Sequence, residues 1–487
     1  MDALPLKETY ESLRSDVDSG VLWAPVRAGL LTKWDRRLEA STYLTEGFGL
    51  RQSLEVLPST VSVSHLAAIC QPSRLKGYPV DPEKGLPFLS AGQVFEANPR
   101  VRKWLATAMV PAVESRYVDL DWLLLSCSGE VGRVTAVYRE HLGKVITHDL
   151  LRIMPRDMEE YGWLYAYMKT PTFFSIARSS QYGHMIKHLE PEHVRTMPVA
   201  MPEEAIRRRV AKDATAAVKM RRKARELQAR ADDLYLHSVN PENVSILKSA
   251  FCTVSVSSLL HGRRRMEGQF HRADILQIEA MLKEAAESVQ PLKDLVKCIS
   301  MLPRFKRYFG ENGTVYRSAA ELFDVNPAVT KRIYAGLLEN PDRYMLRPGE
   351  MVMARSGQTY GLLGRTVVLT ENHDGIFGSE DLIRIVPDQE RARSGYLQTV
   401  LNHVDYGRPR VVRYASGTSV PHLDPLDIRE VLIPRLASSR EVEIADLSDR
   451  ATLLSAEADR LENKAIEVAE DAISKLISRH GNSQPSS

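Results

Sequence analysis

One ten-residue stretch occurs twice in this chain, and this repeat constrains the fold more than any other feature. Residues 90–99 read SAGQVFEANP and residues 318–327 read SAAELFDVNP, with five identical positions 228 residues apart. Other blocks recur in the same order at spacings of 228 to 234 residues, namely 36–39 as 264–267, 128–129 as 356–357, 149–153 as 381–385, and 188–191 as 422–425. A fixed order at a nearly fixed spacing indicates a tandem duplication of a domain of roughly 165–175 residues.

The composition is that of an ordinary globular protein. A chain of 487 residues is long enough for two or three domains, each with its own core. We find no apolar run of about 18 residues that predicts a membrane span, and no basic-then-apolar leader. The four cysteines form no CxxC pair, so we expect reduced thiols in a cytoplasmic protein at Cys70, Cys127, Cys252 and Cys298. The net charge of +3 neither requires nor excludes a nucleic-acid partner.

Short apolar runs in the first copy indicate strands, mixed with helices. We expect strands at residues 87–89, 94–95, 122–125 and 150–154, a short helix at 163–168, and another at 6–17. The runs do not alternate as strand–helix–strand units do. The mixture therefore predicts an α/β fold of the mixed α+β kind, and the second copy repeats the same order of elements.

A long amphipathic helix is expected after each repeat. The apolar positions of each alternate in steps of three and four residues: Ala217, Met220, Ala224, Leu227, Ala231 and Leu234 in the first helix, and Ile444, Leu447, Ala451, Leu454, Ala458, Leu461, Ala465 and Val468 in the second. Such heptad seams are typical of coiled coils, and the recurring alanine lets two backbones approach closely.

The charges of the two helices are opposite. Residues 207–230 contain ten Lys or Arg and two acids, whereas residues 441–471 contain ten acids and three bases. We therefore expect the two helices to pair with each other, most simply as an antiparallel coiled coil. The alternative is that each helix lies separately on its own domain, and a basic helix is also suited to contact a DNA backbone.

Two copies of one domain joined by a helical pair suit a target with two similar half-sites at a set separation. The first helix, expected over residues 203–237, has 35 residues. At about 1.5 Å per residue it is roughly 52 Å long. This length limits the separation of two DNA half-sites to about 15 base pairs. Because the copies differ between their shared blocks, the two half-sites would differ in sequence.

The order of these blocks resembles the specificity subunits of type I restriction-modification systems. The resemblance is carried by RLEASTY at 37–43, by the strand and Ser-Gly turn at 123–129 and 351–357, by the GxxxxHL blocks at 183–189 and 417–423, and by MPVAMPEE at 197–204. It extends over residues 36–480. The chain departs from the family's pattern in the second strand end, IPRL at 433–436, and in its longer N-terminal segment.

The resemblance implies an architecture and a set of partners. Two tandem target-recognition domains would occupy residues 36–202 and 241–436, with spacer helices at 203–240 and 437–480, a helical segment at 1–35 and a disordered tail at 481–487. The family reads bipartite, asymmetric double-stranded DNA in phage defence. It recruits two copies of an adenine-N6 methyltransferase subunit, and in some systems also restriction subunits or other defence proteins. S-adenosylmethionine would be bound by the methyltransferase, so we expect no cofactor on this chain.

Candidate DNA contacts lie in the loops between the shared blocks. Lys and Arg neutralise phosphates, whereas Gln, Ser and Thr can read base edges. The candidates are Lys76, Tyr78, Arg133, Gln181, Tyr182, His184 and Lys187 in the first copy, and Lys306, Arg307, Tyr308, Arg355, Ser356, Gln358, Tyr360, Arg408, Arg410, Arg413, Tyr414, Thr418 and Ser419 in the second. For each, the alternative is an ordinary surface side chain. We interpret His188 and His422 as framework residues bonded to backbone carbonyls.

The sequence contains none of the common catalytic motifs. We find no GxxxxGK loop, no GxGxxG, no Asn- or Asp-Pro-Pro-Tyr, no HExxH and no GxSxG. We therefore expect a non-catalytic recognition subunit without a metal. The competing hypothesis is a coiled-coil protein scaffold with two repeated interaction domains that does not bind DNA.

The helical spacer generates a test. Deleting the seven residues 219–225 removes two helical turns and keeps the seam in register. We expect methylation mapping of a genome that carries this chain and its methyltransferase to show a shorter spacer with both half-sites unchanged. A change in the half-sites themselves would contradict the spacer hypothesis.

Overall fold

The computed structural model describes residues 26, 28–29, 39–183, 187–246, 253–260 and 264–483. The helix expected at 6–17, the candidate contact His184 and the last four residues of the expected tail lie outside these ranges. The chain divides into a first unit, residues 1–219 with 458–487, and a second unit, residues 220–457. Within the described ranges, no helix is both long enough and apolar enough to cross a membrane.

The first unit is built on a four-stranded antiparallel sheet. Its strand order is β2-β9-β6-β7, with β2 at Ala67–Cys70, β9 at Leu150–Pro155, β6 at Leu123–Ser126 and β7 at Val134–Ala136. All four residues of β6 are buried, as a central strand covered on both faces requires. The strands expected at 122–125 and 150–154 are confirmed within one residue of their expected ends.

The second unit contains the same sheet. Its order is β12-β18-β15-β16, with β12 at Val296–Met301, β18 at Leu382–Pro387, β15 at Met351–Ala354 and β16 at Thr366–Val368. The register is also the same, because Leu124 lies opposite Arg152 in the first sheet and Val352 lies opposite Arg384 in the second. The duplication predicted from the sequence is therefore a duplication of fold.

Each unit also has a smaller sheet. In the first it runs β3-β5-β4-β8, with β3 at Pro79–Val80, β5 at Lys103–Ala106, β4 at Gly85–Leu89 and β8 at Val145–Ile146. In the second it runs β14-β13-β17, with β14 at Arg332–Ile333, β13 at Phe309–Arg317 and β17 at Phe377–Gly378. The strand expected at 87–89 is confirmed as part of β4.

The strand expected at 94–95 is wrong. These residues end a short helix, α6 at Ala91–Val94, and Phe95 is its C-cap. The helix begins there because the Ser90 hydroxyl and the Gln93 side chain form a capping box across its first turn. Val94 and Phe95 are buried, and a two-residue apolar run does not distinguish a strand from the end of a helix.

Two pairs of short strands connect the ends of each repeat. Strand β1, Thr60–Ser62, pairs antiparallel with β10, Pro198–Ala200, and β11, Ser288–Pro291, pairs antiparallel with β19, Leu432–Arg435. The smaller helices are α3 at Ala40–Tyr43, α4 at Glu46–Glu55, α5 at Val63–Leu66, α8 at Pro171–Ser179, α9 at Pro191–Arg195, α11 at Val256–Leu260, α12 at Ala273–Ala285, α14 at Arg408–Val412 and α15 at Pro425–Ile428.

One buried helix of each repeat packs against a long helix. In the first unit this is α7, Met158–Met168, which contains the short helix expected at 163–168. It begins earlier than expected because the Asp157 carboxylate caps it by accepting from the Glu159 N–H at 2.8 Å. In the second unit it is α13, Ser394–Asn402.

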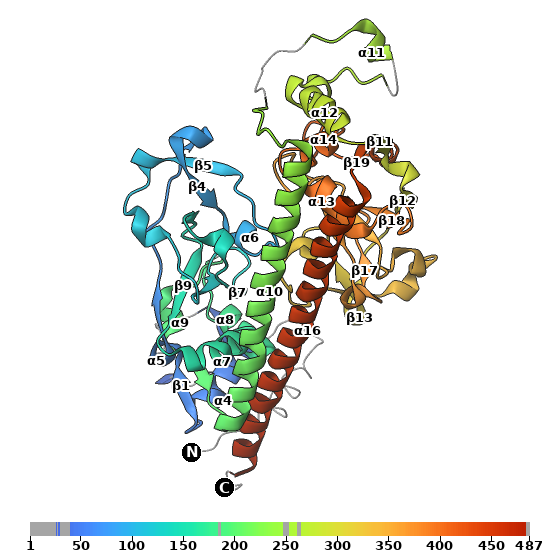
Figure 1. Ribbon diagram of the computed structural model, residues 1–487. Helices are drawn as coiled ribbons and strands as arrows, with labels where there is room; N and C mark the ends of the chain where they lie inside the picture. Colours follow the sequence, from blue (N-terminus) through green and yellow to red (C-terminus); the bar gives the residue numbers. More distant parts are fainter. Residues whose placement is uncertain are drawn as a thin grey trace. The chain divides into compact units, whose positions relative to one another are not determined.

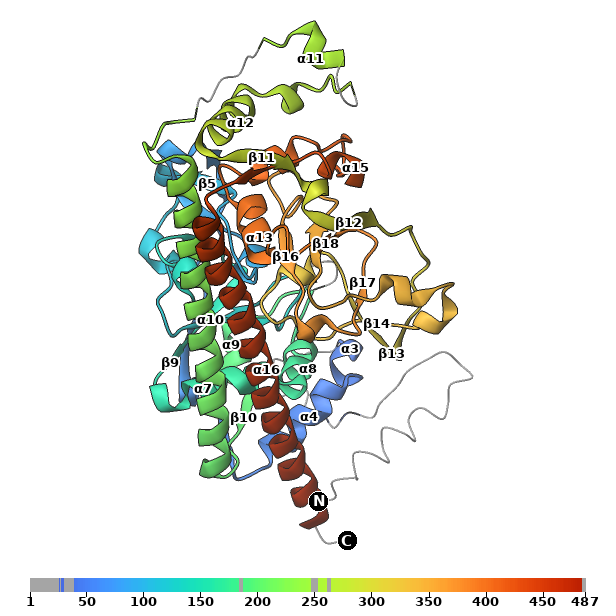
Figure 2. The same cartoon turned by 45° about the vertical axis from the view of Figure 1, so that its right-hand side comes forward.

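The two long helices are α10, Glu204–Val239, and α16, Ser438–Ser483, close to the ranges predicted for them. Each unit contains one part of each helix. In the second unit the two parts lie side by side in both views (Figure 1, Figure 2). Their seam packs Ala224 and Leu227 against Ala451, with Leu447 and Leu454 alongside.

The helix pair in the second unit is antiparallel, as predicted. The Ser448 hydroxyl lies 2.9 Å from the Gln228 side-chain oxygen, four residues beyond Ala224 on α10 and three before Ala451 on α16. Every residue of both predicted seams is buried or half-buried. The seam alanines Ala217, Ala224, Ala231, Ala451, Ala458 and Ala465 are buried, as close backbone approach requires.

Each repeat packs its core on both long helices. The helices therefore lie on the repeats, as the alternative expected, but in the second unit they also pair with each other. The first core includes Val210 and Ala214 of α10 together with Ala469 and Ile473 of α16. The second core includes Tyr235 of α10 together with Ile444 and Ala445 of α16, among others.

Acidic side chains of α16 also bind the repeats. In the first unit, the fully buried Glu462 accepts hydrogen bonds from the Tyr165 hydroxyl, at 2.9 Å, and from Lys169. In the second unit, Arg393 binds Asp446 at 2.6 Å and Asp449 at 2.7 Å. Part of the negative charge of α16 therefore serves contacts with the two repeats.

Two glycines allow this packing and provide a stability test. A Cβ on Gly162 of α7 would lie 2.2 Å from the Ala211 carbonyl oxygen of α10, and one on Gly395 of α13 would lie 2.7 Å from that of Ala445 of α16. We expect Gly162→Ala to lower the free energy of unfolding by at least about 1–3 kcal/mol in urea denaturation, because backbone must move.

The matched control for this test is Gly92→Ala in α6, where a Cβ meets nothing within 4 Å. It should be neutral or stabilising. Equal stability of the Gly162 and Gly92 variants would contradict the close helix approach.

Candidate nucleic-acid interface

In the second unit, a tight turn follows strand β15. The Arg355 N–H donates to the Asp381 carbonyl at 3.0 Å, and the Ser356 hydroxyl lies 2.9 Å from the Asp381 carboxylate and 2.7 Å from His422 Nδ1. This geometry fits a hydroxyl that donates to the carboxylate and accepts from the imidazole. Gly357 has φ +131°, which favours glycine at this turn.

A second loop is bonded to this turn. The Gly357 N–H donates to the Pro421 carbonyl at 3.1 Å, and the Gln358 amide donates to the Ser419 carbonyl at 3.1 Å. Both loops contain candidate contacts named from the sequence, and the structure brings the two loops together. Exposed polar or aromatic side chains of these loops are Gln358, Tyr360, Ser416, Thr418 and Ser419.

A third segment reaches the same turn through Arg307. Its guanidinium donates to the Glu380 carboxylate at 2.6 Å, one residue before Asp381. Its neighbours Lys306 and Tyr308 are exposed, with the ammonium 5.1 Å from the Tyr308 ring centroid. Three segments far apart in sequence thus meet around Asp381, and we call the surface that they form the second turn surface.

The first unit has the same framework. The Cys127 N–H donates to the Asp149 carbonyl at 3.0 Å, and the Gly129 N–H donates to the Lys187 carbonyl at 3.1 Å. His188 exchanges backbone hydrogen bonds with Tyr182 as His422 does with Ser416. Both histidines therefore belong to the framework through their backbones. The predicted bond to a backbone carbonyl is wrong for the His422 ring, which lies 2.7 Å from the Ser356 hydroxyl. We call this the first turn surface.

The side chains on the first turn surface are different and are more fully paired. Arg133 lies 4.1 Å from the Phe95 ring centroid and 3.3 Å from Glu130. The Tyr182 hydroxyl donates to Glu190 at 2.5 Å, and Lys187 lies 3.7 Å from Glu39. Gln181 is half-buried, whereas Lys76 and Tyr78 are exposed.

Buried arginines support the first turn from below. The fully buried Arg152 guanidinium donates to the Ile146 and Thr147 carbonyls, each at 2.9 Å, and Arg116 donates to the Ser73 carbonyl at 3.0 Å. Burial lowers the pKa of Arg152 to about 10, which leaves it charged at neutral pH. Burial also lowers the pKa of His148, against the opposing effect of the Asp149 carboxylate and with the support of the nearby arginines.

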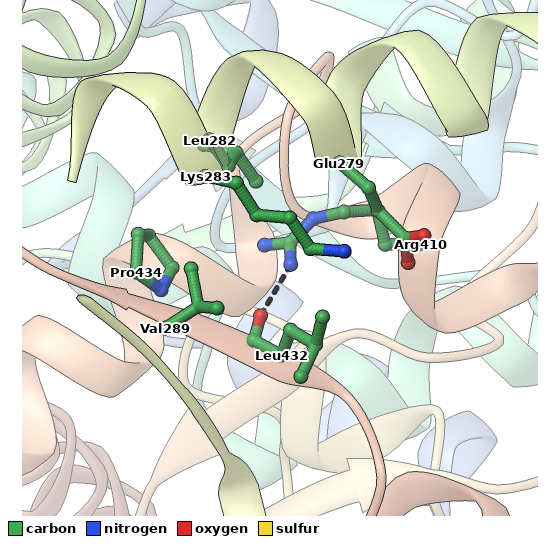
Figure 3. Close-up of a pocket in the computed structure, with 7 residues that line it drawn as sticks. All are labelled: Glu279, Leu282, Lys283, Val289, Arg410, Leu432 and Pro434. Carbon is green, nitrogen blue, oxygen red and sulfur yellow. Dashed lines mark hydrogen bonds between the residues drawn. The ribbon is translucent and has the colours of Figure 1, made fainter.

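Two predicted contacts lie in the interior and are withdrawn. Arg410 is 1% exposed, and its Nε donates to the Tyr406 carbonyl at 2.5 Å. Figure 3 shows its guanidinium bonded to the Leu432 carbonyl beneath α12. The residues around it are so closely packed that the cavity volume open to water is about 0 Å³. Arg413 is 7% exposed, binds Glu279 at 2.6 Å and lies 4.1 Å from the Phe270 ring centroid.

Two neighbours of these arginines are also committed to the fold. Arg408 donates to the carbonyls of Thr359 at 3.0 Å and Gly361 at 2.6 Å, which fixes the loop after the turn. Tyr414 is half-buried against Phe270, with 5.3 Å between the ring centroids. The Arg/Tyr cluster predicted around 408–414 therefore supports the second turn surface rather than forming it.

Sequence reasoning missed the two aspartates whose backbone carbonyls accept hydrogen bonds from the turns. Asp149 and Asp381 lie in a block that recurs, but an acid in a strand-end block carries no signal of what it binds. Among the described residues, no group of three or more His, Cys, Asp or Glu could hold a metal ion. The Ser356 hydroxyl, through its contacts with Asp381 and His422, joins the turn to two other segments of the unit.

Comparisons with known proteins give a fold-level likeness of limited strength. No family model and no curated protein matches the chain. Twelve chains of solved structures match, among them a type I restriction-modification S subunit from M. genitalium, with 11% identity, coverage of 86% of this chain and 96% of that chain, and a TM-score of 0.33.

Two other structures match with similar coverage. The HsdS subunit from Thermoanaerobacter tengcongensis has 13% identity and a TM-score of 0.26, over 86% of this chain and 97% of that one. A structure described as the basis of complex assembly and conformational transition of the type I restriction-modification system has 14% identity and a TM-score of 0.26, over 86% and 98%. Scores of this size carry no argument about function.

The cysteine beneath the first turn gives a test of the site's geometry. Burial and the neighbouring Asp149 raise the pKa of the Cys127 thiol to about 12, whereas Cys70 and Cys298 are exposed. We expect iodoacetamide at pH 8 to alkylate Cys70 and Cys298 in the native protein and Cys127 only after urea unfolding, as read by peptide mass spectrometry. Equal rates at Cys127 and Cys298 would contradict the packed turn.

Proposed function

We propose that this chain is the DNA-specificity subunit of a type I-like restriction-modification or methylation-linked phage-defence system. One observation carries the proposal. Two repeats have the same strand order, the same register and the same bonded turn, but they present different side chains on it. A shared framework with different exposed residues is what the reading of two different half-sites requires.

Equivalent positions on the two turn surfaces differ in their hydrogen-bonding chemistry. Glu130 of the first turn occupies the position of Gln358 in the second, 228 residues later, and both are exposed. A carboxylate accepts from the cytosine amino group, whereas a glutamine amide bonds to adenine in both directions. We propose that these two residues contribute to the different sequence preferences of the two domains.

Affinity would come from cations near the turns. Lys306 is exposed on the second turn surface and Lys76 on the first, and Arg355 lies on the turn itself, half-buried and 4.0 Å from Asp381. Such side chains neutralise phosphates without selecting a sequence. We propose that the turn residues then select the bases, which gives a bipartite, asymmetric double-stranded site.

Catalysis would belong to the partners. We propose that the chain positions two copies of an adenine-N6 methyltransferase, which bind S-adenosylmethionine, and in some complexes also restriction subunits. The chain itself would be non-catalytic and would act in the cytoplasm, where its free cysteines stay reduced.

The competing function is a protein scaffold with two interaction domains. A gel shift with random-sequence duplex separates the two, because a scaffold shows neither binding nor a salt dependence.

The exposed cations make this test quantitative. We expect Lys306→Ala to weaken binding to every duplex sequence alike and to reduce the slope of log affinity against log salt by about 1. The matched control is Arg391→Ala in the same unit, because that side chain is 62% exposed but pairs with Asp388 at 3.4 Å, away from the turn. Equal slopes for the two variants would contradict the placement of DNA on the second turn surface.

A further inference from the structure

The smaller sheet of the second unit contains a strongly irregular ribbon. Both Phe309 and Thr314 of β13 lie opposite Ile333 of β14, so the four residues between them leave the ladder as a bulge. The side chain of Tyr334 packs against this bulge, because a Cβ on Gly310 would lie 2.1 Å from its ring. The ribbon therefore holds a tyrosine ring in a fixed position at its surface.

Aromatic side chains are unusually exposed on this ribbon. Tyr308 is 37% exposed, Phe309 53% and Tyr334 41%. The Tyr334 N–H donates to the Tyr308 carbonyl at 2.8 Å, and the Phe309 ring lies 5.9 Å from that of Tyr316. Rings that are anchored on one side and open to water on the other offer flat faces for stacking.

The charge around these rings is positive. Residues 304–317 and 331–334 contain six Lys or Arg and one acid, Glu311. Arg304, Lys306 and Arg332 are exposed, and none of them pairs with an acid in the part of the chain that the structure describes. Arg332 donates to the Gly313 carbonyl at 3.2 Å, which places its guanidinium beside the bulge.

Beside Tyr334 the ribbon is hollowed. A space of about 410 Å³ is lined by the bulge residues Asn312, Gly313 and Thr314 and by residues 333–337, which include Tyr334. Within the described ranges, the Asn312 amide and the Thr314 hydroxyl make no hydrogen bond to another residue. A flat ring, free polar groups at its edge and unpaired cations nearby match a nucleobase with its phosphates.

We propose that this hollow, which we call the ribbon pocket, binds a nucleobase of single-stranded or locally unpaired DNA. The base stacks on Tyr334, its edge bonds to Asn312 and Thr314, and the flanking phosphates lie against Lys306 and Arg332. The proposal deepens the proposed function, because it adds an unpaired base to the duplex contacts made by the turn surfaces.

The first unit has different residues at the positions that line this pocket, which makes the two repeats unequal. The ribbon there has the same construction, since Pro79 of β3 and Leu86 of β4 both lie opposite Leu105 of β5. However, Ala106 stands at the position of Tyr334, 228 residues earlier, and Lys84 stands at that of Asn312. Without the ring and the amide, no base would be held, so the second repeat alone would bind the unpaired base.

Fluorescence anisotropy with a labelled thymidine 12-mer tests the proposal on the full chain. We expect Tyr334→Ala to weaken binding about tenfold, within the range for the loss of one stacked base, and Asn312→Ala to weaken it less. Tyr334→Phe keeps the ring and should keep most of the affinity. Met158→Ala, an apolar side chain 56% exposed in the first unit, serves as the matched control and should bind as the unmodified chain does.

A 30-base-pair random duplex, measured in parallel, separates this proposal from the proposed function. If the chain binds the duplex but Tyr334→Ala and Tyr334→Phe bind the thymidine strand as the unmodified chain does, the ribbon pocket is overturned and duplex recognition stands. If the strand is bound through Tyr334 but the duplex is not bound, duplex recognition fails and the pocket stands. If neither is bound, both fail. A thermal melt of each variant identifies any loss of binding that is due to unfolding.

Discussion

The structure depends on the close approach of one buried helix in each repeat to the backbone of a long helix. Gly162 of α7 meets the backbone of α10 and Gly395 of α13 meets that of α16, at distances that no side chain would permit. The packing is extended by small residues of the long helices, such as Ala214 in the first core and Ala445 in the second. Because side chains in a close-packed core cannot slide, each repeat is fixed on the part of each helix that its own unit contains.

Because each repeat is fixed on its helices, the side chains exposed on its turn can vary without changing the fold. The turn after β6 or β15 is bonded to a carboxylate-bearing residue and to the loop before α9 or α15, and these are backbone contacts for the most part. Backbone bonds do not depend on which side chain is exposed, so Glu130 and Gln358 can differ while the turn stays the same. Recognition surfaces on fixed scaffolds change their specificity in this way.

The sequence predicted the duplication and the two seams, because each leaves a periodic or repeated signal. It did not predict that Arg410 and Arg413 are buried. The sequence does not distinguish a buried arginine from an exposed one. Arg410 bonds to the Leu432 carbonyl, 22 residues away, and Arg413 bonds to Glu279, 134 residues away, so no local pattern indicates either contact. The α6 helix at 91–94 was missed because the apolar residues at 94–95 were interpreted as a strand. The capping box at Ser90 and Gln93 starts a helix there instead.

The two repeats are alike in one part of their structure and different in another. The framework that recurs is the part that packs on the helices and closes the turn, whereas the smaller sheet has diverged in charge and in aromatic content. Residues 76–89 and 103–106 contain three Lys and two acids, against six cations and one acid for the second ribbon. Stability requires the recurring framework to stay as it is, but the core does not depend on the exposed faces of Tyr334 and Phe309. Exposed aromatic rings in water cost free energy that a partner recovers. The second ribbon exposes Tyr308, Phe309 and Tyr334 whereas the first exposes Tyr78, and this difference favours a contact that the second repeat makes.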